Sequence, residues 1–143
     1  MIKVKIINNS DNSLPEYKKE GDSGMDIRSS ETIVVCRNET RIIHTGIYVE
    51  IPNGYEIQIR SRSGLAAKRG VFVLNEPGTI DSGYRGELGI ILHNVGDDDF
   101  WVNKGDRIAQ LVLQKVPMIC WEATDELSKT DREEGGIGHT GVK

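Results

Sequence analysis

The chain has 143 residues, of which 37% are hydrophobic and 28% charged, and its formal net charge is −4. These values indicate one globular domain with a single core and exclude a chain that is disordered throughout. The acidic net charge, the lack of an apolar run near the ~20 residues of a membrane-spanning helix and the lack of a signal-peptide core predict a cytoplasmic protein with neither nucleic acid nor membrane as a partner.

Short apolar or alternating runs follow one another along the chain, separated by Gly, Asn, Pro and Asp. In order they are KVKII, TIVVC, RIIHTGIYVEI, YEIQIR, GVFVL, ELGIILHN, FWV and RIAQLVLQKV. In YEIQIR, Ile57 and Ile59 alternate with polar residues, which is the period of a strand. The one helix-like piece is SGLAAKRG, residues 63–70, which Gly70 can end. This succession predicts an all-β sandwich or barrel with one short helix.

Cysteine and histidine give little sign of a disulfide or a metal site. Cys36 and Cys120 lie far apart in apolar segments, and we interpret them as small buried hydrophobes in preference to a disulfide. His44, His93 and His139 have no ligand spacing to one another or to the cysteines. This scatter argues against a zinc ion held by protein ligands.

A local basic patch occupies residues 58–70, which contain four Lys or Arg residues and no acid. Within it, Arg62, Ser63 and Gly64 combine a guanidinium, a hydroxyl and a residue that lets backbone amides approach, just before a helix begins. That combination suits a phosphate, although a solvated strand end is the alternative interpretation of this triplet taken alone.

Two further segments offer groups of the same kind. Arg132 precedes GGIGHTG, which adds the Thr140 hydroxyl and unobstructed backbone amides. GDRIAQL places Gln110 as an amide donor in a predicted strand. Asp81 lies in NEPGTIDSGYRGELGIILHN, between two turns. A carboxylate repels phosphates, so beside them Asp81 makes most sense as a general base that takes a proton from an attacking water.

The C-terminal segment SKTDREEGGIGHTGVK, residues 128–143, has one large apolar residue, Ile137, among glycines and charges. Such a segment cannot bury enough surface to order itself. Composition favours a frayed tail over an arm that becomes ordered on a ligand or a neighbouring chain. We therefore predict a globular domain over residues 1–127 and a flexible segment after it.

These motifs together resemble the homotrimeric dUTPase (deoxyuridine 5'-triphosphate nucleotidohydrolase) family. Its five motifs occur in order as GMDI, RSGLA, NEPGTIDSGYRGE, GDRIAQL and REEGGIGHTG, over residues 24–141. The resemblance implies a distorted jelly-roll-like β barrel that forms a three-fold trimer. It also implies that each active site is built from three chains and that residues 128–143 are an arm closing a neighbour's site, which reverses the expectation from composition.

The resemblance also implies roles for the residues of the third motif. The backbone of a hairpin containing Asn75, Gly78 and Gly89 would pair with uracil. Tyr84 would pack its ring against the deoxyribose and leave no room for a 2′-hydroxyl. Asp81 would orient and deprotonate the water that attacks the α-phosphorus.

The implied triphosphate contacts are Arg62, Ser63, Gly64 and Gln110 at the α- and β-phosphates, with Arg132 and Thr140 at the γ-phosphate. Asp26 in GMDI would act through water on a Mg²⁺ cofactor that the phosphates ligate. Ile137 of the fifth motif would cover the base, and Gly138 beside it would also contact the substrate. Ile137 stands where the family usually has a stacking aromatic residue, and His139 stands where serine is usual.

The implied function is hydrolysis of dUTP to dUMP and pyrophosphate, which keeps uracil out of DNA and supplies dUMP for thymidylate synthesis. The nearest enzymatic alternative is a dCTP deaminase, which shares the barrel but needs a catalytic glutamate; the GGIGHTG terminus argues against it. An alternative of another class is a regulatory scaffold that binds a protein partner. The intact set of Asp81, Arg62, Ser63, Tyr84 and Arg132 argues against an inactive scaffold.

Overall fold

The computed structural model describes residues 1–137, which contain eleven strands and one helix. The elements are β1 (Lys5–Asn8), β2 (Met25–Arg28), β3 (Ile33–Val35), β4 (Thr40–Ile43), β5 (Ile47–Glu50), β6 (Tyr55–Arg60), α1 (Ser63–Arg69), β7 (Val71–Val73), β8 (Gly78–Ile80), β9 (Ile90–Asn94), β10 (Phe100–Val102) and β11 (Arg107–Lys115). The predicted all-β class with one short helix is confirmed.

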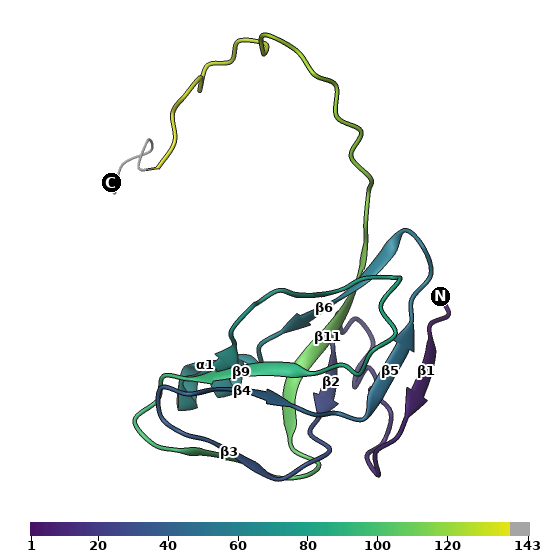
Figure 1. Ribbon diagram of the computed structural model, residues 1–143, viewed down its shortest axis with the longest axis vertical. Coiled ribbons are helices and arrows are strands. Elements are labelled where there is room, and N and C mark those ends of the chain that lie inside the picture. Colours follow the sequence, from purple (N-terminus) through teal and green to yellow (C-terminus); the bar gives the residue numbers. More distant parts are fainter. Residues whose placement is uncertain (138–143) are drawn as a thin grey trace.

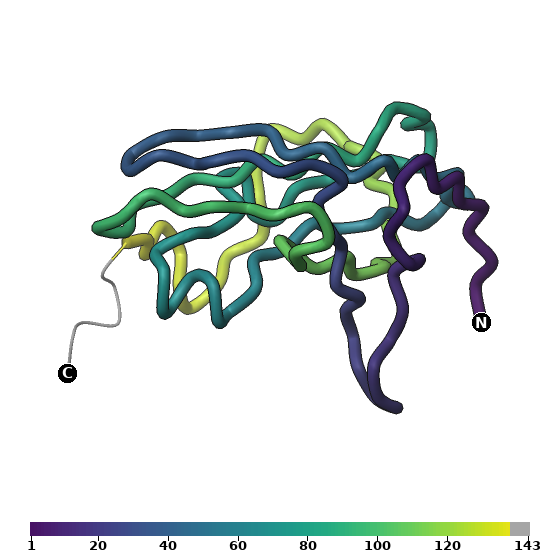
Figure 2. The backbone as a smooth tube through the Cα atoms, turned by 90° about the horizontal axis from the view of Figure 1, so that it is seen from below, coloured from purple at the N-terminus to yellow at the C-terminus, as the bar shows by residue number. Residues whose placement is uncertain are grey.

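The strands form small antiparallel sheets that wrap around one core (Figures 1 and 2). The largest sheet has the order β2-β11-β6-β8, and a three-stranded sheet has the order β4-β9-β7. The two ribbons β1-β5 and β3-β10 complete the body. Because β11 pairs with both β2 and β6, it brings the first and fourth sequence motifs into one sheet and places them near the second motif, which follows β6.

The core follows from the alternation seen in the sequence. Ile57 and Ile59 of β6 are buried, and Ile90 and Leu92 of β9 reach the same core from the three-stranded sheet. Gln58, between the two β6 isoleucines, and Ile91, between the two β9 residues, lie on the opposite face of their strands and are only partly buried. Burying each such aliphatic side chain favours folding by about 1.5–3 kcal/mol, which is why two small sheets can hold together.

Helix α1 ends where the sequence predicts, at Gly70. This glycine has φ of 65° and donates its N–H to Ala66 O. A Cβ at Gly70 would lie 2.7 Å from the backbone nitrogen of Gly96, so a side chain is excluded by both conformation and space. The seven-residue helix is the only one among residues 1–137, and no helix there could cross a bilayer.

The predicted burial of the two cysteines is wrong. Cys36 is half-buried and Cys120 is exposed, and both are free thiols. Cys36 follows the end of β3, where the chain turns away from the core. Cys120 lies in PMICW, whose apolar side chains have left the barrel. An apolar neighbourhood in sequence therefore did not mean burial within one chain.

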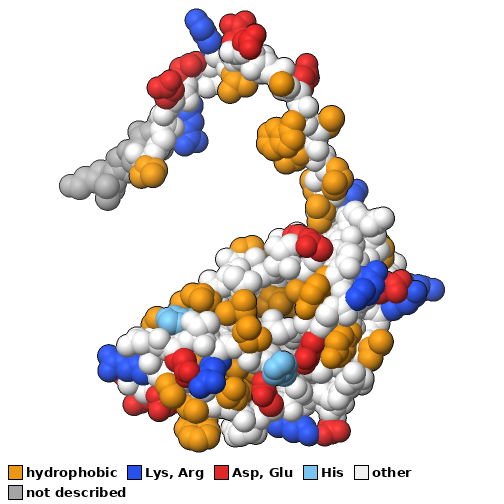
Figure 3. Space-filling view, viewed as in Figure 1, with side chains coloured by type: hydrophobic (Ala, Val, Ile, Leu, Met, Phe, Trp, Pro, Cys, Tyr) orange, Lys and Arg blue, Asp and Glu red, His pale blue; other side chains and the backbone are white. Residues whose placement is uncertain are grey.

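Beyond β11 the chain rises from the barrel as an extended arm (Figure 1). Val116 still donates its N–H to Gly54 O, at 2.8 Å, and residues 117–137 contain neither strand nor helix. Apolar side chains along the arm face water, Trp121 at 86% exposure among them (Figure 3). The predicted division into residues 1–127 and 128–143 stays a prediction.

Candidate active site

Strand pairing brings the candidate phosphate-binding residues together. In the β2-β11 pair, Asp26 lies opposite Gln110, and in the β11-β6 pair Gln110 lies opposite Arg60. Arg62 follows two residues beyond Arg60, at the start of α1. Three segments that are far apart in the sequence therefore meet at one end of the four-stranded sheet.

Asp26 is the centre of this group, which we call the arginine cluster: Asp26, Arg62, Arg107 and Gln110. Asp26 Oδ1 lies 3.2 Å from Arg62 Nε and accepts a hydrogen bond from Gln110 Nε2 at 3.4 Å. Asp26 Oδ2 lies 3.5 Å from Arg107 Nη1. The Asp26 side chain is only 15% exposed, and this largely buried carboxylate holds the two guanidinium groups in place.

A second contact orients the Arg62 guanidinium: its Nη1 donates a hydrogen bond to the carbonyl oxygen of Arg107 at 2.8 Å. These two contacts use only part of the five N–H donors of a guanidinium, which leaves the others for an anion. A cation that is already oriented loses little side-chain freedom when it binds phosphate.

Arg107 is a candidate that sequence reasoning missed. It lies within GDRIAQL, but only Gln110 of that motif was assigned a role. Its ion pair with Asp26 and its carbonyl contact with Arg62 place it in the arginine cluster. The usable signal was an arginine in a motif already assigned to phosphate.

A polar hollow lies beside the arginine cluster. Its lining includes Asp26 and Gln110 from the sheet, and Lys18 and Asp22 from the loop between β1 and β2. That loop protrudes from the body (Figure 2). The tip of this loop is held together by Asp22, whose Oδ2 accepts hydrogen bonds from the backbone N–H groups of Lys18 and Lys19 at 3.1 and 2.8 Å. The hollow thus carries both cationic and carboxylate groups.

Ser63 and Gly64 are exposed at the first turn of α1. A Cβ built on Gly64 meets nothing within 4 Å, so its backbone is open on that side. Both residues therefore remain accessible next to Arg62.

The third motif begins at β8, which pairs with β6 through Gly78 opposite Ile59. A Cβ on Gly78 would lie 3.1 Å from Asn75 Nδ2 and 3.2 Å from Ile59 Cβ. Asn75 and Gly78 are thus in close contact. Directly before β9, a Cβ on Gly89 would lie 2.9 Å from Ile42 Cγ2.

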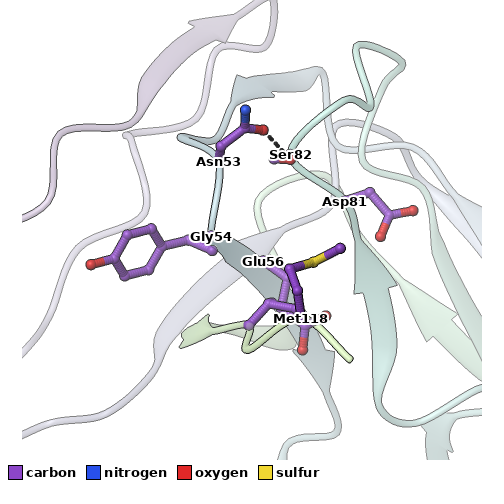
Figure 4. A pocket seen from close by; sticks show the side chains of 8 residues that line it. Asn53, Gly54, Glu56, Asp81, Ser82 and Met118 are labelled. Atoms are coloured by element: carbon purple, nitrogen blue, oxygen red, sulfur yellow. Dashed lines mark hydrogen bonds between the residues drawn. The ribbon is translucent and has the colours of Figure 1, made fainter. Parts of the chain in front are cut away.

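Asp81 follows β8 directly and is exposed. It lines a pocket together with Asn53, Glu56, Ser82 and Met118, as Figure 4 shows. The Ser82 hydroxyl donates to Asn53 Oδ1 at 3.2 Å, which attaches the turn after β8 to the turn before β6. The carboxylate is thus presented to solvent by an anchored turn.

Tyr84 is exposed but not free to move. Its N–H donates to Asp81 O at 3.1 Å, and its phenol donates to Glu87 O at 2.9 Å. The ring lies over Gly86 so closely that a Cβ there would overlap the phenol. Tyr84 therefore presents a fixed aromatic surface.

One chain does not bring Asp81 to the arginine cluster. Ile80 pairs with Ile57, so Asp81 lies level with Glu56, six residues before Arg62. Six residues of strand span about 20 Å. Arg132 and Ile137 lie on the arm, where Arg132 Nε donates to Gly135 O at 2.8 Å. Gly138, His139 and Thr140 lie outside the described residues.

Comparison with known proteins identifies the family of this chain. The family model described as dUTPase matches residues 3–141, which is nearly the whole chain. The chain belongs to the dUTPase family.

Relatives with known names agree with this membership. The chain is 49% identical to the deoxyuridine 5'-triphosphate nucleotidohydrolase of Finegoldia magna over 142 residues, covering 98% of this chain and 99% of that one. The dUTPase of Staphylococcus bacteriophage 80alpha, solved with dUpNHpp, matches with a TM-score of 0.90 at 30% identity, covering 98% and 99% of the two chains. The predicted family, the jelly-roll-like barrel and the prediction of an enzyme are confirmed.

A third relative bears on metal. A point mutant of the dUTPase from phage phi11 of S. aureus matches with a TM-score of 0.81 at 28% identity, over 89% of this chain and 99% of that one. Its structure is described as revealing how a structural Mg(II) ion is coordinated.

In this dUTPase-family chain, Glu87 ties the third motif to the turn between β4 and β5. Its Oε1 accepts the N–H groups of Thr45 and Gly46 at 3.0 and 2.7 Å, and its Oε2 lies 3.0 Å from His44 Nδ1. The hydrogen bond with Glu87 raises the pKa of His44, and Glu31 adds to the effect. Partial burial opposes ionisation of Glu87, but the Gly46, His44 and Thr45 contacts outweigh it and lower the pKa of that carboxyl.

This pair should make stability depend on pH. The His44 contribution is complete below its ordinary pKa of 6.5 and is lost as pH rises through the raised value. The Glu87 contribution is complete above its ordinary pKa of 4.5 and is lost as pH falls through the lowered value. We therefore expect His44→Asn to lower the melting temperature more at about pH 5.5 than at about pH 8.5.

Thermal unfolding of the two proteins at both pH values measures this difference. In a Glu87→Gln background the pH dependence of the His44→Asn effect should disappear. An effect of equal size at both pH values in the original background would contradict the pairing.

Proposed function

We propose that this chain hydrolyses dUTP to dUMP and pyrophosphate by attack of water on the α-phosphorus. The observation that carries the proposal is the combination of phosphate-binding arginines with a candidate base and a candidate sugar-contacting tyrosine. A fixed pair of arginines lies at one end of the sheet, and an exposed Asp81 lies with a hydrogen-bonded Tyr84 in the connection between β8 and β9. A dUTPase-family chain with these groups intact has what this reaction requires.

Asp81 acts as the general base. It takes a proton from the attacking water, and this role suits an exposed carboxylate held by an anchored turn. The arginine cluster, with Ser63 and Gly64, holds the α- and β-phosphates and stabilises the charge that develops on the leaving pyrophosphate. Positioning and electrostatics supply most of the catalysis in such a transfer.

Arg132 and Thr140 hold the γ-phosphate when the arm closes. Asn75, Gly78 and Gly89 pair with uracil through the hairpin backbone. Tyr84 excludes a 2′-hydroxyl because its phenol is hydrogen-bonded to Glu87 O and its ring packs against Gly86. Ile137 then covers the base, and Gly138 beside it contacts the substrate. The product dUMP feeds thymidylate synthesis, and removal of dUTP in the cytoplasm keeps uracil out of DNA.

The residues fit Mg²⁺ that arrives on the triphosphate. Asp22 and Asp26 both line the hollow beside Gln110, which gives carboxylate oxygens for water-mediated contact. Residues 1–137 contain no cluster of three or more His, Cys, Asp or Glu that could hold a metal ion directly. When bound, Mg²⁺ would neutralise phosphate charge, with Asp26 contacting it through water.

The distance between the two halves of the site within one chain supports a trimer with shared sites. Asp81 of one chain lies about 20 Å from its own Arg62. It is therefore better placed to complete the arginine cluster of a neighbour. The arm, with Trp121 and other exposed apolar side chains, suits docking on a third chain.

Pyrophosphate release from dUTP, UTP, dTTP and dCTP tests the function. We expect kcat/KM to be highest for dUTP, because Tyr84 rejects UTP and the C5-methyl of dTTP does not fit the base slot. Cytosine presents a donor where uracil presents an acceptor, and each hairpin group left unpaired costs about 1–3 kcal/mol. Ammonia release from dCTP would instead support the deaminase alternative, and comparable kcat/KM for UTP and dUTP would refute the role of Tyr84.

A further inference from the structure

Glu87 lies between Tyr84, which its carbonyl contacts, and the buried Leu88. Its side chain is 24% exposed, and its carboxylate receives the two backbone N–H groups of the Thr45–Gly46 turn. The turn itself is rigid, because a Cβ on Gly46 would lie 2.9 Å from the Ser10 nitrogen and because Thr45 is buried. The carboxylate is thus attached to an immobile part of the fold.

The backbone around Glu87 is attached to the same turn. The Thr45 hydroxyl donates to Leu88 O at 2.7 Å, and Leu88 N–H donates to Ile47 O at 2.8 Å. Leu88 is fully buried. Residues 87 and 88 are therefore held from both the side chain and the main chain.

The carbonyl oxygen of Glu87 is the acceptor for the Tyr84 phenol, at 2.9 Å. Any shift of residue 87 would move this acceptor. The Tyr84 ring also packs directly against Gly86, where a Cβ would lie 2.3 Å from the phenol oxygen. The ring position thus depends on where Glu87 is held.

We propose that Glu87 is a positioning residue for sugar discrimination. Its carboxylate, held by the Thr45–Gly46 turn and by His44, fixes the carbonyl that holds the Tyr84 ring. Glu87 itself does not touch the nucleotide. This inference rests on the proposed role of Tyr84 in excluding a 2′-hydroxyl.

A purely structural role predicts a loss of stability alone, whereas a positioning role predicts a loss of discrimination. The measured quantity is the ratio of kcat/KM for dUTP to that for UTP. We expect Glu87→Ala to lower this ratio by roughly tenfold, because a displaced ring both admits the ribose and supports the deoxyribose less well. The change should appear in KM for dUTP more than in kcat, since Asp81 is untouched.

Three variants sharpen the test. Glu87→Gln should restore most of the ratio, because the amide oxygen can still accept the Thr45 and Gly46 N–H groups. Glu87→Asp keeps the charge but retracts it by one methylene, so it should lower the ratio several-fold, and it carries the test if the alanine variant does not fold. Glu39→Ala is the matched control: its carboxylate also accepts a backbone N–H, from Cys36 at 2.9 Å, but has no connection to Tyr84.

A double-mutant cycle connects the effect to the phenol. In a Tyr84→Phe background the hydrogen bond to Glu87 is already gone, so Glu87→Ala should change the ratio much less. Folded Glu87→Ala and Glu87→Asp proteins with an unchanged ratio would overturn the positioning role while leaving dUTP hydrolysis intact. An unmodified enzyme that fails to prefer dUTP over UTP would instead overturn the role of Tyr84 on which the inference rests.

Discussion

Replacing Asp81 with asparagine should lower turnover of dUTP by roughly two to four orders of magnitude while the nucleotide still binds. Asparagine keeps the shape of the side chain but cannot accept the proton of the attacking water. The turn should survive, because its contacts are the Asp81 carbonyl to Tyr84 N–H and the Ser82 hydroxyl to Asn53. Loss of activity would therefore not reflect loss of structure.

Single-turnover release of pyrophosphate measures the chemical step, and calorimetry with a non-hydrolysable dUTP analogue measures binding. Asp97→Asn, at an exposed aspartate in the turn before β10, is a matched control that should keep full turnover. Near-normal turnover in the Asp81 variant would remove Asp81 from the mechanism and require another base.

Deletion of everything after Lys129 should leave a folded trimer whose turnover falls by about a hundredfold or more, since it removes the γ-phosphate contacts. Arg132 and the glycine-rich fifth motif are lost, while the barrel and the arm up to residue 129 remain. Because the apolar side chains at Met118, Ile119, Trp121 and Leu127 are retained, assembly should be unaffected.

Sedimentation of both proteins checks the assembly, and dUTP turnover checks the catalysis. Arg132→Ala in the full chain should reproduce much of the loss, whereas Glu134→Ala, two residues away on the same exposed segment, should not. A truncated enzyme with full turnover would show that the segment is a frayed tail, as composition alone suggests.

The strands could be predicted because alternation is a local property. Ile57 and Ile59 identify both the strand and its buried face, and the end of α1 follows from one glycine at residue 70. Strand partners are not local. That β11 would lie between β2 and β6, and so bring Asp26 beside Arg62, depends on contacts between segments that no short pattern describes.

The candidate site was predicted from the motifs rather than from geometry, and its gaps have the same origin. Arg107 was passed over because nothing in the sequence shows that its guanidinium reaches Asp26. Cys120 was assigned to the core because PMICW is apolar, although those side chains leave the barrel of their own chain. In both cases the outcome depends on how distant segments of the chain are arranged, which no short pattern describes.

The distance between Asp81 and Arg62 within one chain has a genetic consequence. If every site draws its base from one subunit and its arginines from another, inactivation is not confined to the mutated polypeptide. A subunit without the base and a subunit without the arginines, each inactive alone, can together form some intact sites when they mix at random. Conversely, one defective subunit inactivates a site to which its neighbours contribute intact residues. Two null alleles that remove different groups could then complement each other.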